Sequence, residues 1–572
     1  MTIRTVGASI GGMCALAVGV VATGFAPTLA AAATNCAALA SDPAGAIAGN
    51  TAIKSATGVV VPAAGSNVAY CKVSLLYGTN PGQNINIVIG LPLSAADGGS
   101  GGVQGAWNGR TEGLGGGGCS GNLNPTAAVN AGYVGSGNDL GHSGGDCEPG
   151  VNPDGSYNVQ FIEDFIRNGI KQQVLWAKKV AEDYYGMAPV YNYWNGCSTG
   201  GRQGYLLAQE LGGELDGILA NAPAMYWTRF QTAQMWGQIA MKELAGGPVS
   251  AAKLAQAGAS AVAACDAADG VIDGVIDDPR SCHFSARANI CGAPTAPASN
   301  CLTAQEANAI DKVWDGPRNE EQHRIWFGLD RGSGFGILDG PTPFALGVIQ
   351  FHWDEHDRGF DWQKVSLAQY PQVAQDGSRN IADVTDTFGP LDTFKEHGGK
   401  LLTYVGANDQ FIYPRGVINY YRQMASRYSE SGEPDFKALQ RFYRLFRAPG
   451  VGHCGIASTG PVPVDPFGAL VNWVEHGAAP DSLLASGGSA APPSGRTRPI
   501  CMYPQTAIYN GTGSTDVAAN FHCGGNLETS AVVCADVLTR YKHEVDGGLD
   551  YRGTGVNGPE CTDRGPDRDG SR

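Results

Sequence analysis

The sequence lacks several patterns that define common classes of protein. Its 572 residues contain no pair of cysteines in CxxC spacing, which argues against a cysteine-based zinc site. After the N-terminus, no segment has about 20 uninterrupted apolar residues, so the mature chain is not expected to span a membrane. Lysine and arginine number 38 against 53 acidic residues, and the net charge of −15 argues against nucleic acid as a partner. The chain also has no internal repeats.

The composition is that of a globular protein with many turns. Hydrophobic residues make up 43% of the chain and charged residues 16%, so wholesale disorder is not expected. The 83 glycines favour tight turns and ordered loops over a helical bundle. The length suffices for a large core together with an insertion, and nothing in the sequence indicates an oligomeric state.

The N-terminus has the features of a signal peptide. Arg4 supplies a positive charge, residues 10–25 are mostly apolar, and small residues at 28–33 offer cleavage sites. We expect residues 1–33 to be removed and the protein to be secreted, outside the cell or into the periplasm; a membrane anchor is the alternative. Cys14 leaves with this segment, and the remaining fourteen cysteines favour disulfides in an oxidising compartment.

Patterns along the chain predict a parallel α/β architecture, because strands alternate with helices. Strands are predicted at residues 84–89, 190–194, 400–405 and 441–448, and helices at residues 159–185, 202–211 and 466–476. A very glycine-rich loop follows the first strands, at residues 113–121.

Residues 196–200, Gly-Cys-Ser-Thr-Gly, match the G-x-S-x-G nucleophile motif. The serine of this motif lies on a sharp turn between a strand and a helix, where flanking side chains would collide with backbone. The first amides of the helix then face the reacting centre, where an oxyanion develops. A strand is predicted before the motif and a helix after it, so we assign Ser198 as the nucleophile. A plain glycine-rich turn is the alternative.

A serine nucleophile needs a base, and the base needs an acid that orients it. In the α/β-hydrolase fold both follow the serine, the acid first, on loops after later strands. Asp409 and His453 each follow a predicted strand, so we predict the triad Ser198, Asp409 and His453. His142 precedes the serine and would break this order, so we expect it to have a structural or pocket-wall role.

The fold class that we predict is an α/β-hydrolase core with a large inserted lid domain. The core comprises residues 36–224 and 399–525, and the lid comprises residues 225–398, a segment rich in aromatic residues and loops. Residues 526–572 are polar, and we expect a partly ordered C-terminal tail there.

Two cysteines flank the predicted catalytic residues. Cys197 immediately precedes the serine, and Cys454 immediately follows the histidine. A disulfide between them would hold the nucleophile and base loops together, and the loop-entropy model gives an upper estimate of roughly 5 kcal/mol for its stabilisation. The alternative is that both cysteines pair elsewhere.

These segments resemble the tannase and feruloyl esterase family, which also contains the hydrolase of mono(2-hydroxyethyl) terephthalate. The matching segments are residues 107–110, 196–204, 265–270, 398–401, 450–454, 496–499 and 501–505, spread over nearly the whole mature chain. The resemblance implies the same triad and the Cys197–Cys454 bridge. It also implies an oxyanion hole formed by the amides of Thr199 and Gly115, with Gly116 as the alternative to Gly115.

The family pattern and sequence proximity suggest four further disulfides, Cys36–Cys71, Cys265–Cys282, Cys291–Cys301 and Cys501–Cys523. Cys119–Cys147 and Cys534–Cys561 then pair by elimination.

An acidic segment in the predicted lid suits a hard cation. Clustered carboxylates interleaved with glycines favour oxygen coordination, although the spacing is not that of an EF-hand loop. The segment resembles the family's calcium site, which implies a structural calcium ion held by carboxylates of Asp266, Asp269 and Asp273 and by carbonyls of Val271 and Val275. Asp277 is less expected as a ligand, and a solvated acidic turn is the alternative.

The predicted function is that of a secreted serine esterase acting on small aromatic esters through an acyl-enzyme. Aromatic residues of the lid could stack on the acyl ring, and we select Trp227, Phe351 and Trp353, although most such residues would pack the lid's own core. No arginine stands out to bind a terephthalate carboxylate, so a hydroxycinnamoyl group such as feruloyl is favoured, followed by galloyl. A peptidase or acyltransferase and an inactive, secreted carbohydrate-binding protein are the alternatives from other classes.

Overall fold

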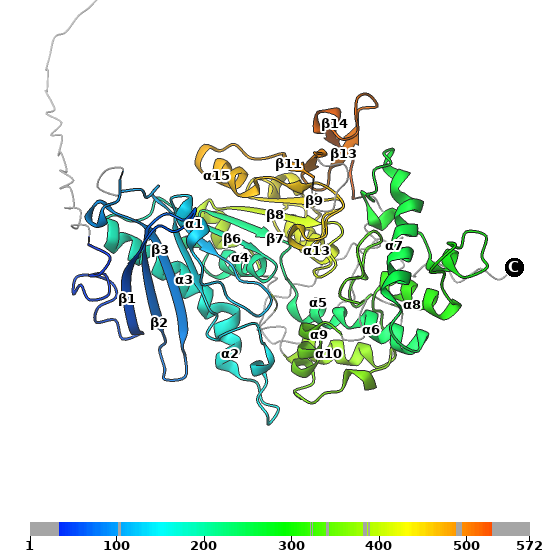
Figure 1. Cartoon of the computed structure of the whole chain (residues 1–572), viewed down its shortest axis with the longest axis horizontal. Coiled ribbons are helices and arrows are strands. Elements are labelled where there is room, and N and C mark those ends of the chain that lie inside the picture. Colours follow the sequence, from blue (N-terminus) through cyan, green and yellow to red (C-terminus); the bar gives the residue numbers. More distant parts are fainter. Residues whose placement is uncertain are drawn as a thin grey trace, which may run out of the picture.

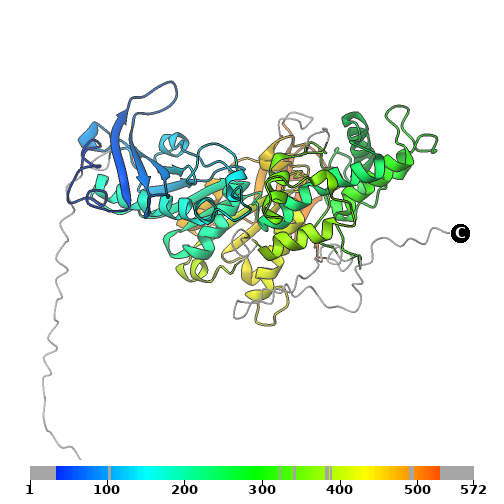
Figure 2. The same ribbon diagram turned by 90° about the horizontal axis from the view of Figure 1, so that it is seen from below.

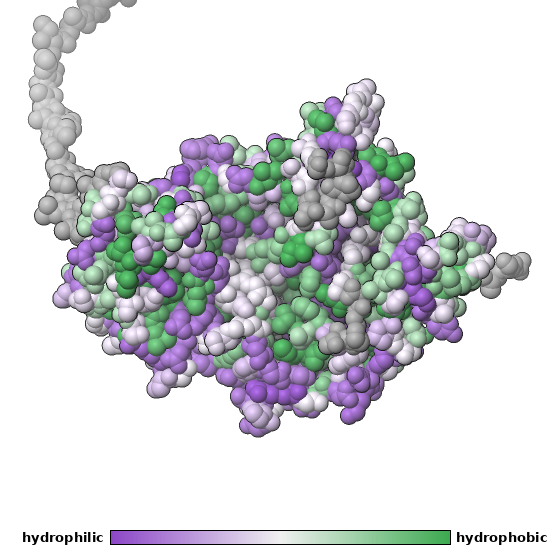
Figure 3. All heavy atoms as spheres, in the orientation of Figure 1, coloured by the Kyte–Doolittle hydropathy of each residue, from purple (hydrophilic) through white to green (hydrophobic). Residues whose placement is uncertain are grey.

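The computed structural model describes residues 34–100, 105–320, 322, 324–338, 343–380, 386, 389–487 and 495–528. The predicted signal peptide, the Cys534–Cys561 pair and nearly all of the predicted tail lie outside these ranges. In the part of the chain that the structure describes, no helix combines the length and the apolarity needed to cross a bilayer. On the face drawn in Figure 3, hydrophilic and hydrophobic residues are intermixed over most of the surface.

A nine-stranded sheet runs through the molecule in the order β1-β2-β3-β5-β4-β6-β7-β8-β9 (Figure 1). The strands are β1 (Ile53–Val61), β2 (Tyr70–Tyr77), β3 (Ile85–Pro92), β4 (Arg110–Leu114), β5 (Val134–Asn138), β6 (Tyr191–Cys197), β7 (Gly217–Asn221), β8 (Lys400–Gly406) and β9 (Tyr443–Ala448). The pairs β1–β2, β2–β3 and β3–β5 are antiparallel. All pairings from β5 to β9 are parallel, so the carboxyl ends of six strands lie along one edge. The predicted α/β class is confirmed, but the sheet is mixed and not wholly parallel, because β1, β2 and β3 add antiparallel strands at one edge.

Alternate residues of the central strands are buried on opposite faces of the sheet, as the two-residue period of a strand requires. Ile218 and Leu401 belong to one apolar core, whereas their neighbours Leu219 and Leu402 belong to another. The first face packs against α3 (Gly169–Tyr185), α4 (Thr199–Glu210) and α13 (Pro414–Arg427), and the second against α15 (Pro466–His476). The sheet is therefore covered on both sides.

Within the described residues, the chain between β7 and β8 contributes helices and loops but no strand to the main sheet. Its helices are α5 (Trp227–Gln234), α6 (Trp236–Ala240), α7 (Ala251–Cys265), α8 (Ala304–Asp315), α9 (Ala345–Asp354), α10 (Tyr370–Asn380) and α12 (Asp392–His397). Figure 2 shows α7 and α8 at the end of the molecule opposite β1. The inserted segment thus has its own helical architecture, and its action as a lid stays a prediction.

The remaining elements are short. Two small sheets follow the main one, formed by β10 (Val462–Pro463), β11 (Ser482–Ser486) and β12 (Thr497–Cys501), and by β13 (Thr506–Tyr509) and β14 (Phe521–Gly524). The other helices are α1 (Thr126–Asn130), α2 (Val159–Glu163) and α14 (Phe436–Leu439).

The helix predicted over residues 159–185 is interrupted. A π-helical turn at Asp164–Asn168 separates α2 from α3. The buried carboxylate of Asp164 accepts hydrogen bonds from the side-chain amides of Gln83 (2.6 Å) and Asn168 (3.0 Å). The bond from Gln83 comes from a distant part of the chain, so the periodicity of the segment could not reveal it.

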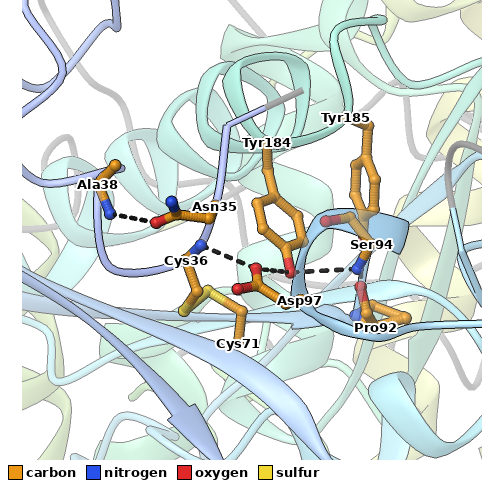
Figure 4. The surroundings of a disulfide bond; sticks show 9 residues. All are labelled: Asn35, Cys36, Ala38, Cys71, Pro92, Ser94, Asp97, Tyr184 and Tyr185. Carbon is orange, nitrogen blue, oxygen red and sulfur yellow. Dashed lines mark hydrogen bonds between the residues drawn. A yellow bond between two sulfur atoms is a disulfide. The ribbon is translucent and has the colours of Figure 1, made fainter. Parts of the chain in front are cut away.

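The start of the described chain is fixed to the sheet and to α3 (Figure 4). Cys36 and Cys71 form the predicted disulfide. The amide of Cys36 and the hydroxyl of Tyr184 donate to the Asp97 carboxylate at 2.8 and 2.7 Å, and the Ser94 amide donates to that hydroxyl at 3.1 Å. This network joins the N-terminal segment to the sheet and to the helix layer that contains α3.

Glu112 on β4 generates a prediction about pH and stability. Its side chain is buried and accepts a hydrogen bond from the side-chain amide of Asn195 at 3.0 Å. Burial raises the pKa of Glu112 from 4.5 to about 7, partly offset by that hydrogen bond. The folded state therefore binds the Glu112 proton more tightly than the unfolded state does. As the pH rises from 4.5 to about 7, ionisation of Glu112 lowers the free energy of unfolding.

We therefore expect Glu112→Gln to match the wild-type free energy of unfolding near pH 4.5 and to exceed it by up to about 3 kcal/mol above pH 8. Urea unfolding of both proteins across this pH range measures the difference. A difference that does not change with pH would contradict the prediction.

Candidate active site

Ser198 lies in the turn that joins β6 to α4. Its backbone has φ 62° and ψ −125°, a conformation that residues other than glycine rarely adopt. The Ser198 amide donates to the Asn221 carbonyl (3.0 Å), and the Ser198 carbonyl accepts from the Ala224 amide (3.1 Å). The turn is thus held by the chain that leaves β7, and strained positions of this kind cluster at functional sites.

The glycines of the motif allow backbone segments to pass closely. A Cβ atom on Gly196 would lie 2.4 Å from the Gly200 backbone, and a Cβ atom on Gly200 would lie 2.9 Å from the Gly116 carbonyl oxygen. The spacing of the motif therefore has the steric cause that the sequence predicted.

Asp409 and His453 lie in contact on the loops that follow β8 and β9. The Nδ1 atom of His453 is 2.9 Å from Oδ2 of Asp409. The other carboxylate oxygen of Asp409 accepts the amides of Phe411 (2.9 Å) and Ile412 (2.8 Å). Asp409 is 1% exposed and His453 9% exposed, so their contact is shielded from water. An acid held in this way fixes the orientation of the imidazole.

A disulfide brings the serine and histidine loops together. Cys197 and Cys454 are bonded, with their Cα atoms 6.0 Å apart across a sequence separation of 257 residues. Because each cysteine is a direct neighbour of a predicted catalytic residue, the Cα atoms of Ser198 and His453 can be no more than about 14 Å apart. Three loops at the carboxyl edge of the sheet thus meet at one place.

Aromatic side chains that the sequence did not single out lie beside this site. The ring of Phe411 is 5.1 Å from the imidazole of His453, and the ring of Phe344 is 5.3 Å from that of Phe411. Phe344 belongs to the inserted segment, just before α9. Position after a strand could have suggested Phe411, whereas no local signal pointed to Phe344.

His142 has the structural surroundings that we expected for it. Its Nε2 atom faces the Cys119 carbonyl at 2.6 Å, and its Nδ1 atom faces the Leu140 carbonyl at 3.2 Å. Both ring nitrogens therefore contact backbone of neighbouring loops.

The prediction for Gly115 requires a correction. Its amide donates to the Asn195 carbonyl at 3.0 Å, continuing the ladder between β4 and β6, so it is not available to an oxyanion. The amide of Gly116, the alternative, donates to Oε1 of Gln203 at 3.0 Å. Thr199 is the first residue of α4, where helical geometry provides no acceptor for the amide.

The three aromatic residues selected for substrate contact are packing residues in this structure, which corrects that prediction. Phe351 and Trp353 are 0% and 1% exposed. The ring of Phe351 packs against Phe360, and the indole of Trp353 donates to the Cys147 carbonyl at 3.1 Å. Trp227 is also buried, in contact with Phe165 and Phe230. Burial in the cores leaves these rings no free face for a substrate.

The acidic segment forms a compact loop. The carboxylate of Asp266 accepts the amides of Asp273 (3.1 Å), Gly274 (3.0 Å) and Val275 (3.3 Å). Within the described residues, no three acidic, histidine or cysteine side chains converge in a metal-binding arrangement. The predicted site also uses two backbone carbonyls, so calcium stays a prediction.

Two observations in this loop fit a bound cation. The Oδ1 atom of Asp273 is buried without a hydrogen-bond partner, while Oδ2 pairs with Arg498. Burial and then the charges of Asp269 and Asp273 raise the pKa of Asp277 to about 8. Asp277, which the sequence disfavoured as a ligand, thus lies among the carboxylates.

All six predicted disulfides whose cysteines are described are present: Cys36–Cys71, Cys119–Cys147, Cys197–Cys454, Cys265–Cys282, Cys291–Cys301 and Cys501–Cys523.

The comparison with known proteins identifies the family. The model of the family "Tannase and feruloyl esterase" matches residues 103–348 and 344–524. The chain belongs to this family. It is 32% identical over 482 residues to a probable feruloyl esterase of Arthroderma benhamiae, an alignment that covers 80% of the chain and 86% of the relative. It is also 29% identical over 391 residues to feruloyl esterase C of Talaromyces stipitatus, covering 63% and 70% of the two chains. The predicted family and the predicted carboxylic ester hydrolase activity are confirmed.

Solved structures share the fold of this family member. Feruloyl esterase B of Aspergillus oryzae has a TM-score of 0.70 at 24% identity, covering 82% of this chain and 96% of that one. Tannin acyl hydrolase of Aspergillus niger has a TM-score of 0.72 at 22% identity, covering 85% and 92%.

The Cys197–Cys454 bridge generates a prediction about both stability and turnover. Replacing both cysteines by alanine should lower the free energy of unfolding by about 2–5 kcal/mol, because the bridge closes a long loop. It should also lower kcat about tenfold or more, because the serine and histidine loops lose their covalent link. Urea unfolding and ester hydrolysis measure the two effects.

The matched control replaces Cys291 and Cys301, which bridge a separation of only 10 residues within the inserted segment. This double variant should lose stability and keep kcat. Equal effects of the two double variants on kcat would contradict a specific role of the Cys197–Cys454 bridge.

Proposed function

We propose that this family member is a serine esterase in which Ser198, His453 and Asp409 form the catalytic triad. Two facts carry the proposal. His453 pairs with the buried carboxylate of Asp409, and a disulfide joins the loop of His453 to the strained turn of Ser198. The six parallel strands with the site at their carboxyl edge support an α/β-hydrolase core, and residues 225–398 would form its lid.

In the proposed reaction, His453 takes the proton of the Ser198 hydroxyl as the oxygen attacks the ester carbonyl. Asp409 holds the imidazole tautomer and stabilises its protonated form. The Thr199 amide, at the start of α4, stabilises the oxyanion. The alcohol leaves with the proton from His453, and water then hydrolyses the acyl-enzyme by the same steps.

We propose an aromatic acyl group of the hydroxycinnamoyl type, such as feruloyl, as the substrate class. The names of the similar esterases support this choice. Phe411, whose ring neighbours His453, and Phe344, whose ring neighbours that of Phe411, offer aromatic surface for the acyl ring and replace the residues selected from the sequence. A galloyl ester is the second candidate, because the fold is also that of a tannin acyl hydrolase.

We also propose that the protein is secreted. The six disulfides of the described residues suit an oxidising compartment, and the N-terminal sequence has the features of a signal peptide.

Replacing Ser198 by alanine should lower the hydrolysis of methyl ferulate at least about 10⁴-fold, because the nucleophile is lost. The wild-type enzyme should prefer methyl ferulate to methyl gallate, and both to a terephthalate monoester, by kcat/KM. Ser285→Ala, in the inserted segment, is the matched control and should keep wild-type turnover.

Turnover by Ser198→Ala at the wild-type rate would refute the serine assignment. An inactive wild-type protein would instead support the carbohydrate-binding alternative. A preference for methyl gallate would reassign the substrate class without changing the triad.

We further propose a structural calcium ion held by Asp266, Asp269 and Asp273 with the carbonyls of Val271 and Val275. The buried, unpartnered oxygen of Asp273 and the raised pKa of Asp277 support it, because a divalent cation would compensate the gathered negative charge. The ion would order the loop and take no part in the chemistry.

Removal of calcium with EDTA should lower the melting temperature by several degrees, because calcium at a hundred times its Kd stabilises by about 3 kcal/mol. Calcium should restore the melting temperature better than magnesium, and Asp269→Asn should lose the response. An unchanged melting temperature, with no metal found in the untreated protein, would contradict the site.

A further inference from the structure

We propose that the side chains of Thr199 and Gln203 are positioning residues, which fix the peptide orientations of the glycine run at residues 115–118 beside Ser198. The inference rests on the proposed function, because it concerns the same active site. It assigns to these side chains a role separate from that of the Thr199 backbone amide.

Both residues belong to α4 and lie four positions apart, so they face the same side of the helix. Each is 1% exposed. The hydroxyl of Thr199 donates to the Gly118 carbonyl at 2.7 Å, and Oε1 of Gln203 accepts from the Gly116 amide at 3.0 Å. The helix that begins directly after the nucleophile therefore holds the glycine run at two points.

The run cannot be held by side chains of its own. A Cβ atom on Gly115 would lie 2.5 Å from the Gly200 Cα atom, and a Cβ atom on Gly116 would lie 2.1 Å from the Ser120 carbonyl oxygen. Close approach to the nucleophile turn thus requires glycine at position 115, and the run's own turn onto Ser120 requires it at position 116. Four consecutive glycines have more backbone freedom than other residues, so the restraint must come from neighbouring elements.

The orientation of each peptide group matters because its two sides have opposite polarity. A peptide group of the run that rotated by half a turn would exchange the positions of its N–H and C=O groups, and the direction of its dipole beside the nucleophile turn, where the oxyanion develops, would be reversed. The hydroxyl of Thr199 directs the Gly118 carbonyl toward α4, and Gln203 holds the amide of Gly116 in the same direction. Catalysis by oriented dipoles requires that they be fixed before the charge develops.

The far end of the run is fixed in other ways. Cys119 forms a disulfide with Cys147, and its carbonyl contacts His142. The Gly117 amide closes a turn onto the Ser120 carbonyl at 3.0 Å. These bonds hold the loop as a whole, whereas the bonds from Thr199 and Gln203 relate it to the nucleophile helix.

The test is steady-state hydrolysis of methyl ferulate by Thr199→Val, which removes the hydroxyl and keeps the shape of the side chain. We expect kcat to fall about tenfold while KM changes less than about twofold, because the lost orientation is needed only in the transition state. Thr199→Ser keeps a hydroxyl and should recover most of the lost kcat. Gln203→Leu removes the second bond and should lower kcat in the same way.

A second readout is the rate at which a p-nitrophenyl phosphonate inactivates the enzyme, since this reaction also places negative charge beside Ser198. The rate should fall by the same factor as kcat. Thr111→Val is the matched control, because the Thr111 hydroxyl is buried on β4 and donates to Asn192 at 2.9 Å. It should lower the melting temperature as Thr199→Val does and keep kcat.

Wild-type kcat in both Thr199→Val and Gln203→Leu would overturn the inference, as would an equal loss of kcat in Thr199→Ser. A rise in KM at constant kcat would assign the side chains to substrate binding and overturn it as well. These outcomes differ from failure of the proposed function, which would show as Ser198→Ala retaining turnover.

Discussion

The active site depends on one constraint, the strained turn of Ser198 between β6 and α4. A serine with φ 62° and ψ −125° persists in this sparsely populated conformation only where the surroundings determine it. Here the chain leaving β7 binds the turn on one side, and the glycine run packs against Gly200 on the other. The Cys197–Cys454 bridge then attaches the histidine loop to the same turn. Hydrogen bonds, close packing and a covalent bond thus all fix the turn of Ser198 at the carboxyl edge of the sheet.

The inserted helical segment contacts the loop of Asp409, where the side chain of Gln234 donates to the Phe411 carbonyl at 2.9 Å and the side chain of Asn408 donates to the Gly332 carbonyl at 2.6 Å. Phe344 contacts Phe411, which in turn neighbours His453. Most of the large aromatic residues of the insertion are instead buried in its own cores or against the sheet layer. The interior of the insertion is thus packed by its own aromatic residues, and Phe344 at its edge faces the loop of the proposed base.

The sequence predicted the features that depend on local spacing. The strands before Ser198, Asp409 and His453 are present, and so is the one disulfide whose two cysteines adjoin Ser198 and His453. Tertiary contacts decided the features that it missed. The Gly115 amide joins the β4–β6 ladder, and Phe351 and Trp353 are buried, which no single segment could indicate. Asp164 in the π-helical turn likewise accepts a hydrogen bond from the side chain of Gln83, which lies in a distant loop.

A crystal structure of the enzyme inactivated by an aryl phosphonate tests the central claim most directly. We expect phosphorus bonded to Oγ of Ser198 and a phosphoryl oxygen about 3 Å from the Thr199 amide nitrogen. We also expect Nε2 of His453 to lie within hydrogen-bonding distance of the adduct. Phosphorus on another residue, or an imidazole turned away from Ser198 with Asp409 still bound to it, would contradict the account.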